Sequence, residues 1–185
     1  MSLAAFLQRV VSILQAVDVP FMITGSLAAA FYGQPRATQD VDVVVEIEPN
    51  HVDRLVEKLA AAGLYVSGDA AREAVRYAGQ FNAIDPETGW KADFIVRKER
   101  AFSRSEFERR KPAQLLGVDV WLASVEDLVV AKLEWSELGD SELQRQDIVE
   151  ILQTTGDVID REYVEHWAAA LGLSDAWKRV QASLK

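Results

Sequence analysis

The sequence of 185 residues contains no cysteine, only two histidines and no apolar stretch near the length of a membrane-spanning helix. Without cysteine, the chain forms no disulfide, no thiolate metal site and no cysteine nucleophile. A membrane span needs about 20 consecutive apolar residues, so we expect no membrane partner. The two histidines, His51 and His166, lie in polar helical contexts, and we interpret both as surface residues.

The composition that is present, with 49% hydrophobic and 26% charged residues, is typical of a globular protein with one good core. Residues 1–20 alternate apolar and polar side chains with a helical period and carry Gln8 and Arg9 in the middle. This pattern predicts an amphipathic helix and not a signal peptide, so we expect a cytoplasmic protein. The net charge of −9 disfavours indiscriminate binding to nucleic acid.

The most informative segment is the apolar run 40–47, which begins with two carboxylates, Asp40 and Asp42. A strand alternates its side chains, so both carboxylates lie on one face and repel each other. A cation removes this cost, and Mg²⁺ prefers carboxylate oxygens. The alternative interpretation is a solvent-facing strand edge.

Upstream, the predicted strand 21–24 ends at Gly25-Ser26, and residues 27–31 have a helical pattern. A Gly-Ser turn that opens a helix offers backbone N–H groups to a phosphate. Taken alone, the turn is equally consistent with a simple serine cap. Together with the carboxylate pair, it indicates nucleotide chemistry.

A third carboxylate, Asp93, interrupts the apolar segment 90–96. The turn-forming sequence 85–89 separates this segment from residues 80–84, which predicts a hairpin. An aspartate in the second arm is as unfavourable as the first two, since strands disfavour Asp. Asp93 is therefore a candidate for the same site as Asp40 and Asp42.

The order of the remaining patterns predicts an α/β (α+β) fold, in which a mixed sheet flanked by helices is followed by a helical part. We expect an α/β domain over residues 1–123 and a C-terminal helical subdomain over 124–185. Further helices are predicted at residues 2–17, 51–62, 70–77, 124–136, 141–153, 160–171 and 174–184, and further strands at 64–66 and 118–122.

Residues 97–111 carry seven Lys or Arg against three Glu, in contrast to the acidic remainder. One interpretation is a solvated helix face. The other is a docking patch for RNA or a protein partner, and the sequence leaves both open.

The Gly25-Ser26 turn, the Asp40-Val41-Asp42 strand and Asp93 together resemble the nucleotidyltransferase superfamily. Its signature combines a Gly-Ser or Gly-Gly turn, an Asp-x-Asp/Glu strand and a third carboxylate. Residues 25–45 look most like the branch of abortive-infection toxins and related bacterial proteins. That branch has a Gly-x-x-Arg-x-Thr-x-Asp pattern, which here is formed by Gly33, Arg36, Thr38 and Asp40.

A weaker similarity to this branch covers residues 124–133 and 145–148, where a lysine and a later aspartate complete the active site. These positions are Lys132 and Asp147. Without the resemblance, Lys132 reads as a solvated helix residue, and Asp147 reads as an ion-pair partner of Arg145 or Lys132.

The resemblance implies Mg²⁺-dependent transfer of a nucleoside monophosphate from a nucleoside triphosphate to an acceptor hydroxyl. The acceptor is RNA, a protein or a small molecule. The implied metal ligands of a two-metal site are Asp40, Asp42 and Asp93, with Asp93 also helping to deprotonate the acceptor. The implied nucleotide-binding residues are Gly25, Ser26, Arg36, Thr38, Lys132 and Asp147.

Two other functions stay open at this point. The first is a nucleotide-binding or partner-binding protein that uses the same fold without turnover. The second is a component of a toxin–antitoxin pair, which describes genetic context and not chemistry.

Overall fold

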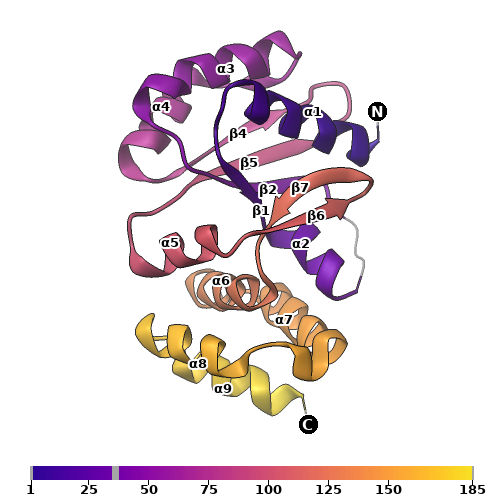
Figure 1. Cartoon of the computed structure of the whole chain (residues 1–185), viewed down its shortest axis with the longest axis vertical. Helices are drawn as coiled ribbons and strands as arrows, with labels where there is room; N and C mark the ends of the chain where they lie inside the picture. Colours follow the sequence, from indigo (N-terminus) through magenta and orange to yellow (C-terminus); the bar gives the residue numbers. More distant parts are fainter. Residues whose placement is uncertain (1, 35–37, 185) are drawn as a thin grey trace.

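The computed structural model describes residues 2–34 and 38–184, which build one mixed sheet with helices on both sides (Figure 1). The helices are α1 Leu3–Ala16, α2 Gly25–Tyr32, α3 Val52–Ala61, α4 Gly68–Tyr77, α5 Ala101–Glu108, α6 Val125–Leu138, α7 Glu142–Thr155, α8 Arg161–Ala170 and α9 Ser174–Ser183. Two short 3₁₀ helices are η1 Pro49–His51 and η2 Gly156–Val158. The strands are β1 Phe21–Ile23, β2 Asp40–Val45, β3 Tyr65–Val66, β4 Gln80–Ile84, β5 Lys91–Val96, β6 Lys111–Leu115 and β7 Val118–Leu122.

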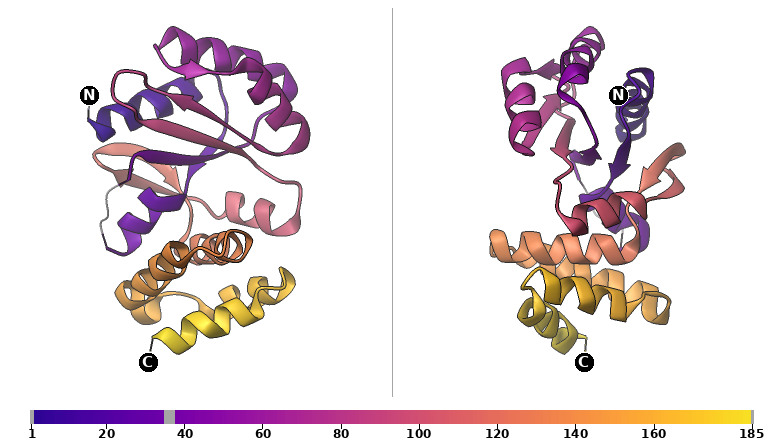
Figure 2. Two further views of the ribbon diagram at one scale, coloured as in Figure 1. Left: turned by 180° about the vertical axis from the view of Figure 1, so that it is seen from behind. Right: turned by 60° about the vertical axis from the view of Figure 1, so that its left-hand side comes forward.

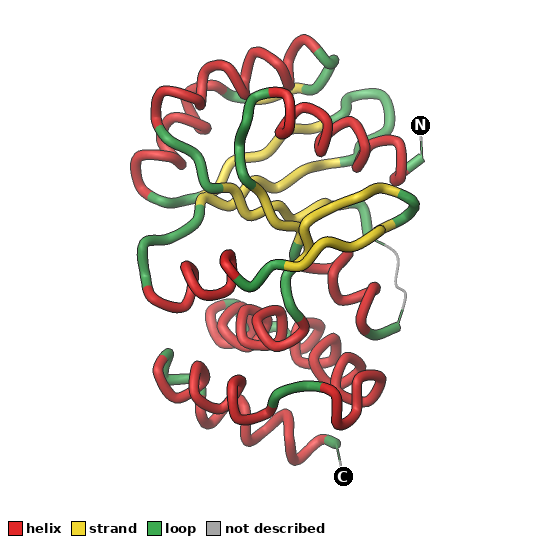
Figure 3. The backbone as a smooth tube through the Cα atoms, viewed as in Figure 1, coloured by secondary structure: helices red, strands yellow, loops and turns green. Residues whose placement is uncertain are grey.

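The seven strands form one sheet in the order β3-β4-β5-β2-β1-β7-β6. Strand β2 lies at the centre, parallel to β5 and antiparallel to β1, while β7 is parallel to β1. The strands appear in Figure 3 as one continuous layer between helices. The predicted mixed sheet flanked by helices is therefore confirmed.

Strand β2 shows why its sequence forms a central strand. Val41, Val43 and Val45 are completely buried on one face, and Asp40 and Asp42 are half-buried on the other. The period of two places every second valine in the core and both carboxylates on the opposite face, as predicted.

The helices divide between the two sides of the sheet. Helices α1, α3 and α4 lie on the side away from the C-terminal helices, and α2 and α5 lie on the side towards them (Figures 1 and 2). Helices α6 to α9 then stack beyond α2 and α5, with α6 packed against both α7 and α8. Among the described residues, no helix combines the length and apolarity needed to cross a membrane.

The segment 97–111 differs most from the sequence analysis, which assigned no strand there. It folds into helix α5 and leads into edge strand β6, which pairs antiparallel with β7. Strand β6 has little alternation of apolar and polar residues, and Pro112 sits in it, which a sheet tolerates only at an edge. Its pairing with β7, and not its own pattern, makes it a strand.

Candidate functional site

The turn between β1 and α2 holds the Asp42 carboxylate against the start of the helix. The Thr24 N–H donates to the Asp42 carbonyl oxygen at 3.0 Å, and the Ser26 N–H donates to Asp42 Oδ2 at 3.4 Å. Gly25 has a φ of +63°, and a Cβ at this position would lie 1.9 Å from Asp42 Oδ2. Only glycine therefore allows the backbone to approach the carboxylate this closely. The helix begins at Gly25 with Thr24 as its N-cap, so the serine-cap interpretation is wrong.

The parallel pairing of β2 and β5 places Asp42 beside Asp93 and Asp40 beside Lys91. Neighbouring strands lie about 4.8 Å apart, and paired residues project from the same face of the sheet. The structure thus brings Asp42 and Asp93 side by side. Beside Asp40 it places a lysine.

Lys91 links the carboxylates of Asp40 and Asp93. The sequence analysis did not single out this lysine. Its Nζ lies 2.8 Å from Asp93 Oδ2 and 3.6 Å from Asp40 Oδ1. The signal was its position two residues before Asp93, which puts both side chains on one face of the strand. Within the described residues, no three His, Asp or Glu side chains are grouped as a metal-binding cluster.

The surroundings of Asp42 favour a bound cation. Burial raises the pKa of its carboxyl, and the negative charges of Asp93 and Asp40 raise it further. The Ser26 N–H and the Lys132 charge lower the pKa of the same carboxyl. Mg²⁺ needs only one or two protein carboxylates and completes its shell with water and phosphate oxygens. The adjacent Asp42 and Asp93 carboxylates fit this requirement.

A cleft of about 510 Å³ opens beside these carboxylates. Five of the predicted site residues line it, namely Gly25, Ser26, Asp42, Asp93 and Lys132. Its far wall comes from α5 and α6, so the cleft extends from the sheet towards the C-terminal helices. A second depression of about 890 Å³ is formed by residues of α7, α9 and the α6–α7 connection instead.

Lys132 is a buried cation at the wall of the cleft beside Asp42 and Asp93. The residue is only 2% exposed, so the interpretation as a solvated helix residue is wrong. Lys132 Nζ lies 2.7 Å from Asp147 Oδ2 and donates to Gln144 Oε1 at 2.8 Å, and these contacts join α6 to α7. The same charge lowers the pKa of Asp42 across the cleft. Asp147 is itself buried and pairs with Lys132, which was one of its two predicted partners.

The remaining predicted residues lie before β2. Thr38 Oγ1 accepts a hydrogen bond from the Asp40 N–H at 3.2 Å and lies 3.1 Å from the Asp40 carbonyl oxygen. Thr38 therefore shapes the turn that starts the strand. Arg36 lies outside the described residues.

The basic segment 97–111 is largely neutralised within the chain. Arg97 pairs with Glu46 and Glu99, and Arg104 also approaches Glu99. Arg100 donates to both carboxylate oxygens of Glu134. These internal ion pairs leave less free positive charge for a polyanionic partner than the sequence alone indicates.

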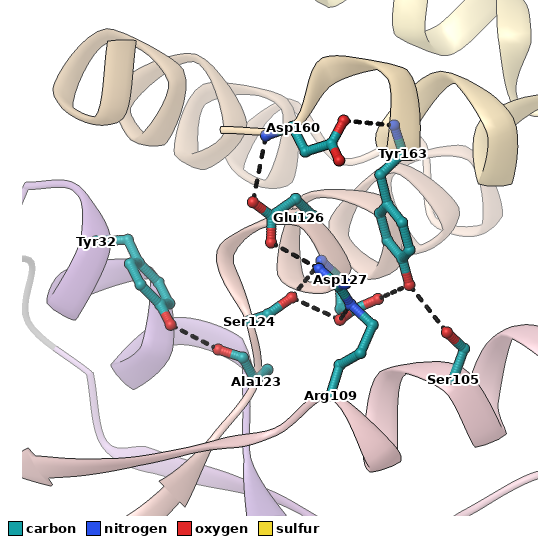
Figure 4. Close-up of polar contacts among 9 residues, drawn as sticks. All are labelled: Tyr32, Ser105, Arg109, Ala123, Ser124, Glu126, Asp127, Asp160 and Tyr163. Carbon is teal, nitrogen blue, oxygen red and sulfur yellow. Dashed lines mark hydrogen bonds and ion pairs between the residues drawn. The ribbon is translucent and has the colours of Figure 1, made fainter. Parts of the chain in front are cut away.

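A buried polar network ties α5, α6 and α8 together (Figure 4). Asp127 accepts hydrogen bonds from Ser124 Oγ at 2.5 Å, Arg109 Nε at 3.0 Å and the Tyr163 hydroxyl at 2.6 Å. Glu126 accepts from Arg109 Nη2 at 3.1 Å. Burial and the Asp127 carboxylate raise the pKa of Tyr163 to about 12, which keeps its hydroxyl a donor. The network holds one wall of the cleft in place.

Helix α5 contributes the carboxyl group of Glu106 to the cleft. The sequence analysis counted this residue only as one of the three glutamates in segment 97–111. Glu106 lines the cleft, and burial raises its pKa to about 8. A strong departure of this kind in a cleft is typical of functional residues. The sequence contains no local signal for it, because its burial depends on the packing of α5 against α6.

The chain has the fold of a mixed α/β sheet with carboxylates on adjacent central strands and a helical C-terminal part. Solved structures with a similar architecture include an antibiotic-resistance factor and a lincosamide antibiotic adenylyltransferase. The antibiotic-resistance factor ANT(2'')-Ia in solution has a TM-score of 0.59 at 16% identity, over 98% of this chain and 94% of that chain. Its complex with adenylyl-2''-tobramycin has a TM-score of 0.59 at 14% identity, over 90% and 95%.

The lincosamide antibiotic adenylyltransferase LnuA in its lincomycin-bound form has a TM-score of 0.54 at 14% identity, over 82% of this chain and 96% of that chain. No protein-family model and no curated protein matches the sequence. The chain therefore shares its fold with these antibiotic-modifying proteins.

Proposed function

We propose that the protein transfers a nucleoside monophosphate from a nucleoside triphosphate to an acceptor hydroxyl, with Mg²⁺ as cofactor. The observation that carries this proposal is the pairing of Asp42 with Asp93 at the edge of a cleft. The Gly25-Ser26 turn and the Lys132 cation line the same cleft. Carboxylates, helix N-terminal N–H groups and a lysine together are what a metal-bound triphosphate requires.

In this proposal, Asp42 and Asp93 would hold Mg²⁺, which when bound would neutralise charge on the triphosphate and on the departing pyrophosphate. Asp40 completes the carboxylate set once Lys91 releases it, since Lys91 lies against Asp40 and Asp93 in the structure. Two metal ions would be held in this way.

The nucleotide would lie along the cleft with its phosphates at the Gly25-Ser26 turn. Lys132 would neutralise phosphate charge, aided by Arg36, while Thr38 and Asp147 hold the surrounding segments. The acceptor oxygen forms a bond to the α-phosphorus as the bond to the β-phosphate oxygen breaks. Asp93 takes the proton of the acceptor hydroxyl, and pyrophosphate leaves.

The small molecules bound in two of the similar structures support a small-molecule acceptor. ANT(2'')-Ia was crystallised with adenylyl-2''-tobramycin, and LnuA was crystallised with lincomycin. The first ligand is an adenylylated small molecule, and the second is a small molecule bound to an adenylyltransferase. In addition, the internal ion pairs of segment 97–111 weaken the case for a long RNA acceptor. We therefore favour a small molecule over RNA or protein.

The alternative is a protein that binds nucleotide on this fold without turnover. One observation favours it: Lys91 already neutralises Asp40 and Asp93. An active enzyme must move this lysine, whereas a binding protein keeps it in place.

The test uses nucleoside triphosphates labelled at the α-phosphate, a pool of small-molecule, RNA and protein acceptors, and calorimetry with Mg²⁺ or EDTA. We expect Mg²⁺-dependent nucleotide binding and label on one acceptor class. Asp42→Asn should lower labelling by at least about 100-fold, because a metal ligand supplies several kcal/mol. Asp119→Asn, an exposed strand aspartate, is the matched control.

Nucleotide binding without label on any acceptor supports the binding protein. Label that persists in Asp42→Asn places the chemistry elsewhere. Identical weak binding with Mg²⁺ and with EDTA removes the nucleotide function altogether.

A further inference from the structure

Trp135 is an exposed aromatic side chain in the wall of the cleft beside Asp42 and Asp93. It is 47% exposed, and among the described residues no aromatic ring or cationic side chain stacks on it. Trp121 on β7 is similarly exposed, at 43%, but it lies outside the cleft, with the Arg110 guanidinium 5.4 Å from the centre of its ring. Ligand clefts are lined mainly by aromatic and apolar side chains, so an uncovered ring at this place is available to a ligand.

The sheet side of the cleft changes from charged to apolar along the two central strands. Asp42 pairs with Asp93 in the register of β2 and β5, and two residues further along Val44 pairs with Ile95. Both pairs project from the same face of the sheet, about 7 Å apart along the strands. All four residues line the cleft, which therefore continues from the carboxylates over an apolar floor formed by Val44 and Ile95.

Helix α6, which forms the other wall, also passes from charge to an apolar surface. The Lys132 charge acts on Asp42 across the cleft and lowers the pKa of its carboxyl. Trp135 follows three residues later, on the same face of the helix and about 4.5 Å further along its axis. Ala131 and Leu138 line the cleft beside it. An aromatic ring among apolar side chains thus lies within one helical turn of a cation that faces the carboxylates.

A ring that stacks on Trp135 belongs to the nucleotide and not to the acceptor. The acceptor hydroxyl attacks in line with the departing pyrophosphate, so it approaches the α-phosphorus from the side opposite the phosphates that Lys132 neutralises in the proposed function. Trp135 is the neighbour of Lys132 on the helix face, and a nucleobase is joined to its phosphates through a single ribose. The planar group next to this cation is therefore the base.

We propose that Trp135 stacks on the nucleobase of the bound triphosphate and supplies much of the affinity that the phosphates do not. This inference rests on the proposed function. Stacking on an aromatic side chain accepts any base, because every base presents a π face. A purine covers more of the apolar surface than a pyrimidine, so ATP and GTP should bind more tightly than CTP and UTP.

The test measures the dissociation constants of ATP, CTP and inorganic triphosphate with Mg²⁺ by calorimetry, for the full chain and three variants. Trp135→Ala should lower the affinity for ATP about 5- to 150-fold, as the loss of one base–aromatic stack does, and leave the affinity for inorganic triphosphate unchanged. The preference for ATP over CTP should shrink in the same variant. Trp135→Phe should keep most of the ATP affinity, since its ring still stacks, while the quenching of tryptophan fluorescence by ATP should largely disappear.

Trp121→Ala removes an equally exposed tryptophan outside the cleft and is the matched control, which should bind all three ligands as the wild type does. An ATP affinity that is unchanged in Trp135→Ala would overturn the inference while the proposed function stands. A parallel loss of ATP and inorganic triphosphate would also overturn it, because Trp135 would then act through the phosphate-binding groups. An unchanged ATP affinity with a raised KM for the acceptor would assign the ring to the acceptor instead. Absence of Mg²⁺-dependent binding by any nucleotide removes both the inference and the proposed function.

Discussion

Gly25 and Asp42 lie so close that a side chain at residue 25 would overlap the carboxylate. The missing Cβ leaves room for Asp42 Oδ2, which a Cβ would approach to 1.9 Å, and the backbone of Gly25 has a left-handed φ of +63°. Two separate constraints, one steric and one conformational, therefore require glycine at this turn.

Gly25→Ala should destabilise the protein and weaken Mg²⁺-dependent nucleotide binding, because the added Cβ must displace the Asp42 carboxylate. Gly63→Ala is the control, since Gly63 also has a positive φ of +80° but open space around it. We expect about 1 kcal/mol of destabilisation for Gly63→Ala and at least about 2 kcal/mol more for Gly25→Ala, measured by urea unfolding. Equal losses for the two variants would show that the overlap with Asp42 relaxes at no cost.

Lys91→Met should increase the affinity of the carboxylates for divalent cations. Lys91 Nζ lies within ion-pair distance of Asp93 and Asp40, so it competes with a metal for both. The pair is partly exposed, and we expect a gain of about 1 kcal/mol, which is roughly a fivefold change. Titration with Mn²⁺, followed by electron paramagnetic resonance, measures it. Lys58→Met on the exposed face of α3 should change nothing, and an unchanged affinity in Lys91→Met would exclude competition.

Tyr163→Phe should destabilise the protein by about 1.5–3 kcal/mol, because Asp127 loses one charged hydrogen bond in a buried site. Phenylalanine keeps the ring, on which the Arg109 guanidinium stacks at 4.0 Å, so the change isolates the hydroxyl. Tyr65→Phe, at an exposed residue of β3, should stay within about 0.5 kcal/mol of the wild type. Denaturant unfolding checks both values, provided that the slope of the unfolding free energy against denaturant concentration is the same for the variants and the wild type. A stable Tyr163→Phe variant would mean that water replaces the hydroxyl.

The free energy of unfolding should decrease as the pH rises from about 4.5 to about 8, because Glu106 keeps its proton in the folded protein and loses it in the unfolded chain over this range. Its folded-state pKa of about 8 lies above the ordinary 4.5, so the folded protein binds the extra proton in this range. Stability therefore decreases as pH rises, and the full cost is present above pH 8. Glu106→Gln removes this cost and should exceed the wild type by about 1–3 kcal/mol at pH 8, with little difference at pH 4.5. A difference that does not grow with pH would mean that Glu106 titrates normally.

Local sequence patterns predicted most of the fold because each depends on neighbours along the chain. The strand that begins at Asp40, the hairpin whose second arm contains Asp93 and the helix capped by Ser124 all follow from alternation, turn residues or capping. Strand β6 did not follow, since its pairing partner β7, and not its own sequence, stabilises it. A pattern predicts an element only where the element's own residues carry its stability.

The sequence by itself determined that Asp42 and Asp93 are carboxylates on apolar strands and that Gly25 opens a helix beside them. Only the tertiary structure decided that β2 and β5 are neighbours, that Lys91 lies between Asp40 and Asp93, and that Lys132 is buried. It also decided that Glu106 is buried in the wall of the cleft. The physical reason is that burial and charge pairing depend on residues far apart in the chain, whereas strand and turn preferences depend on adjacent ones.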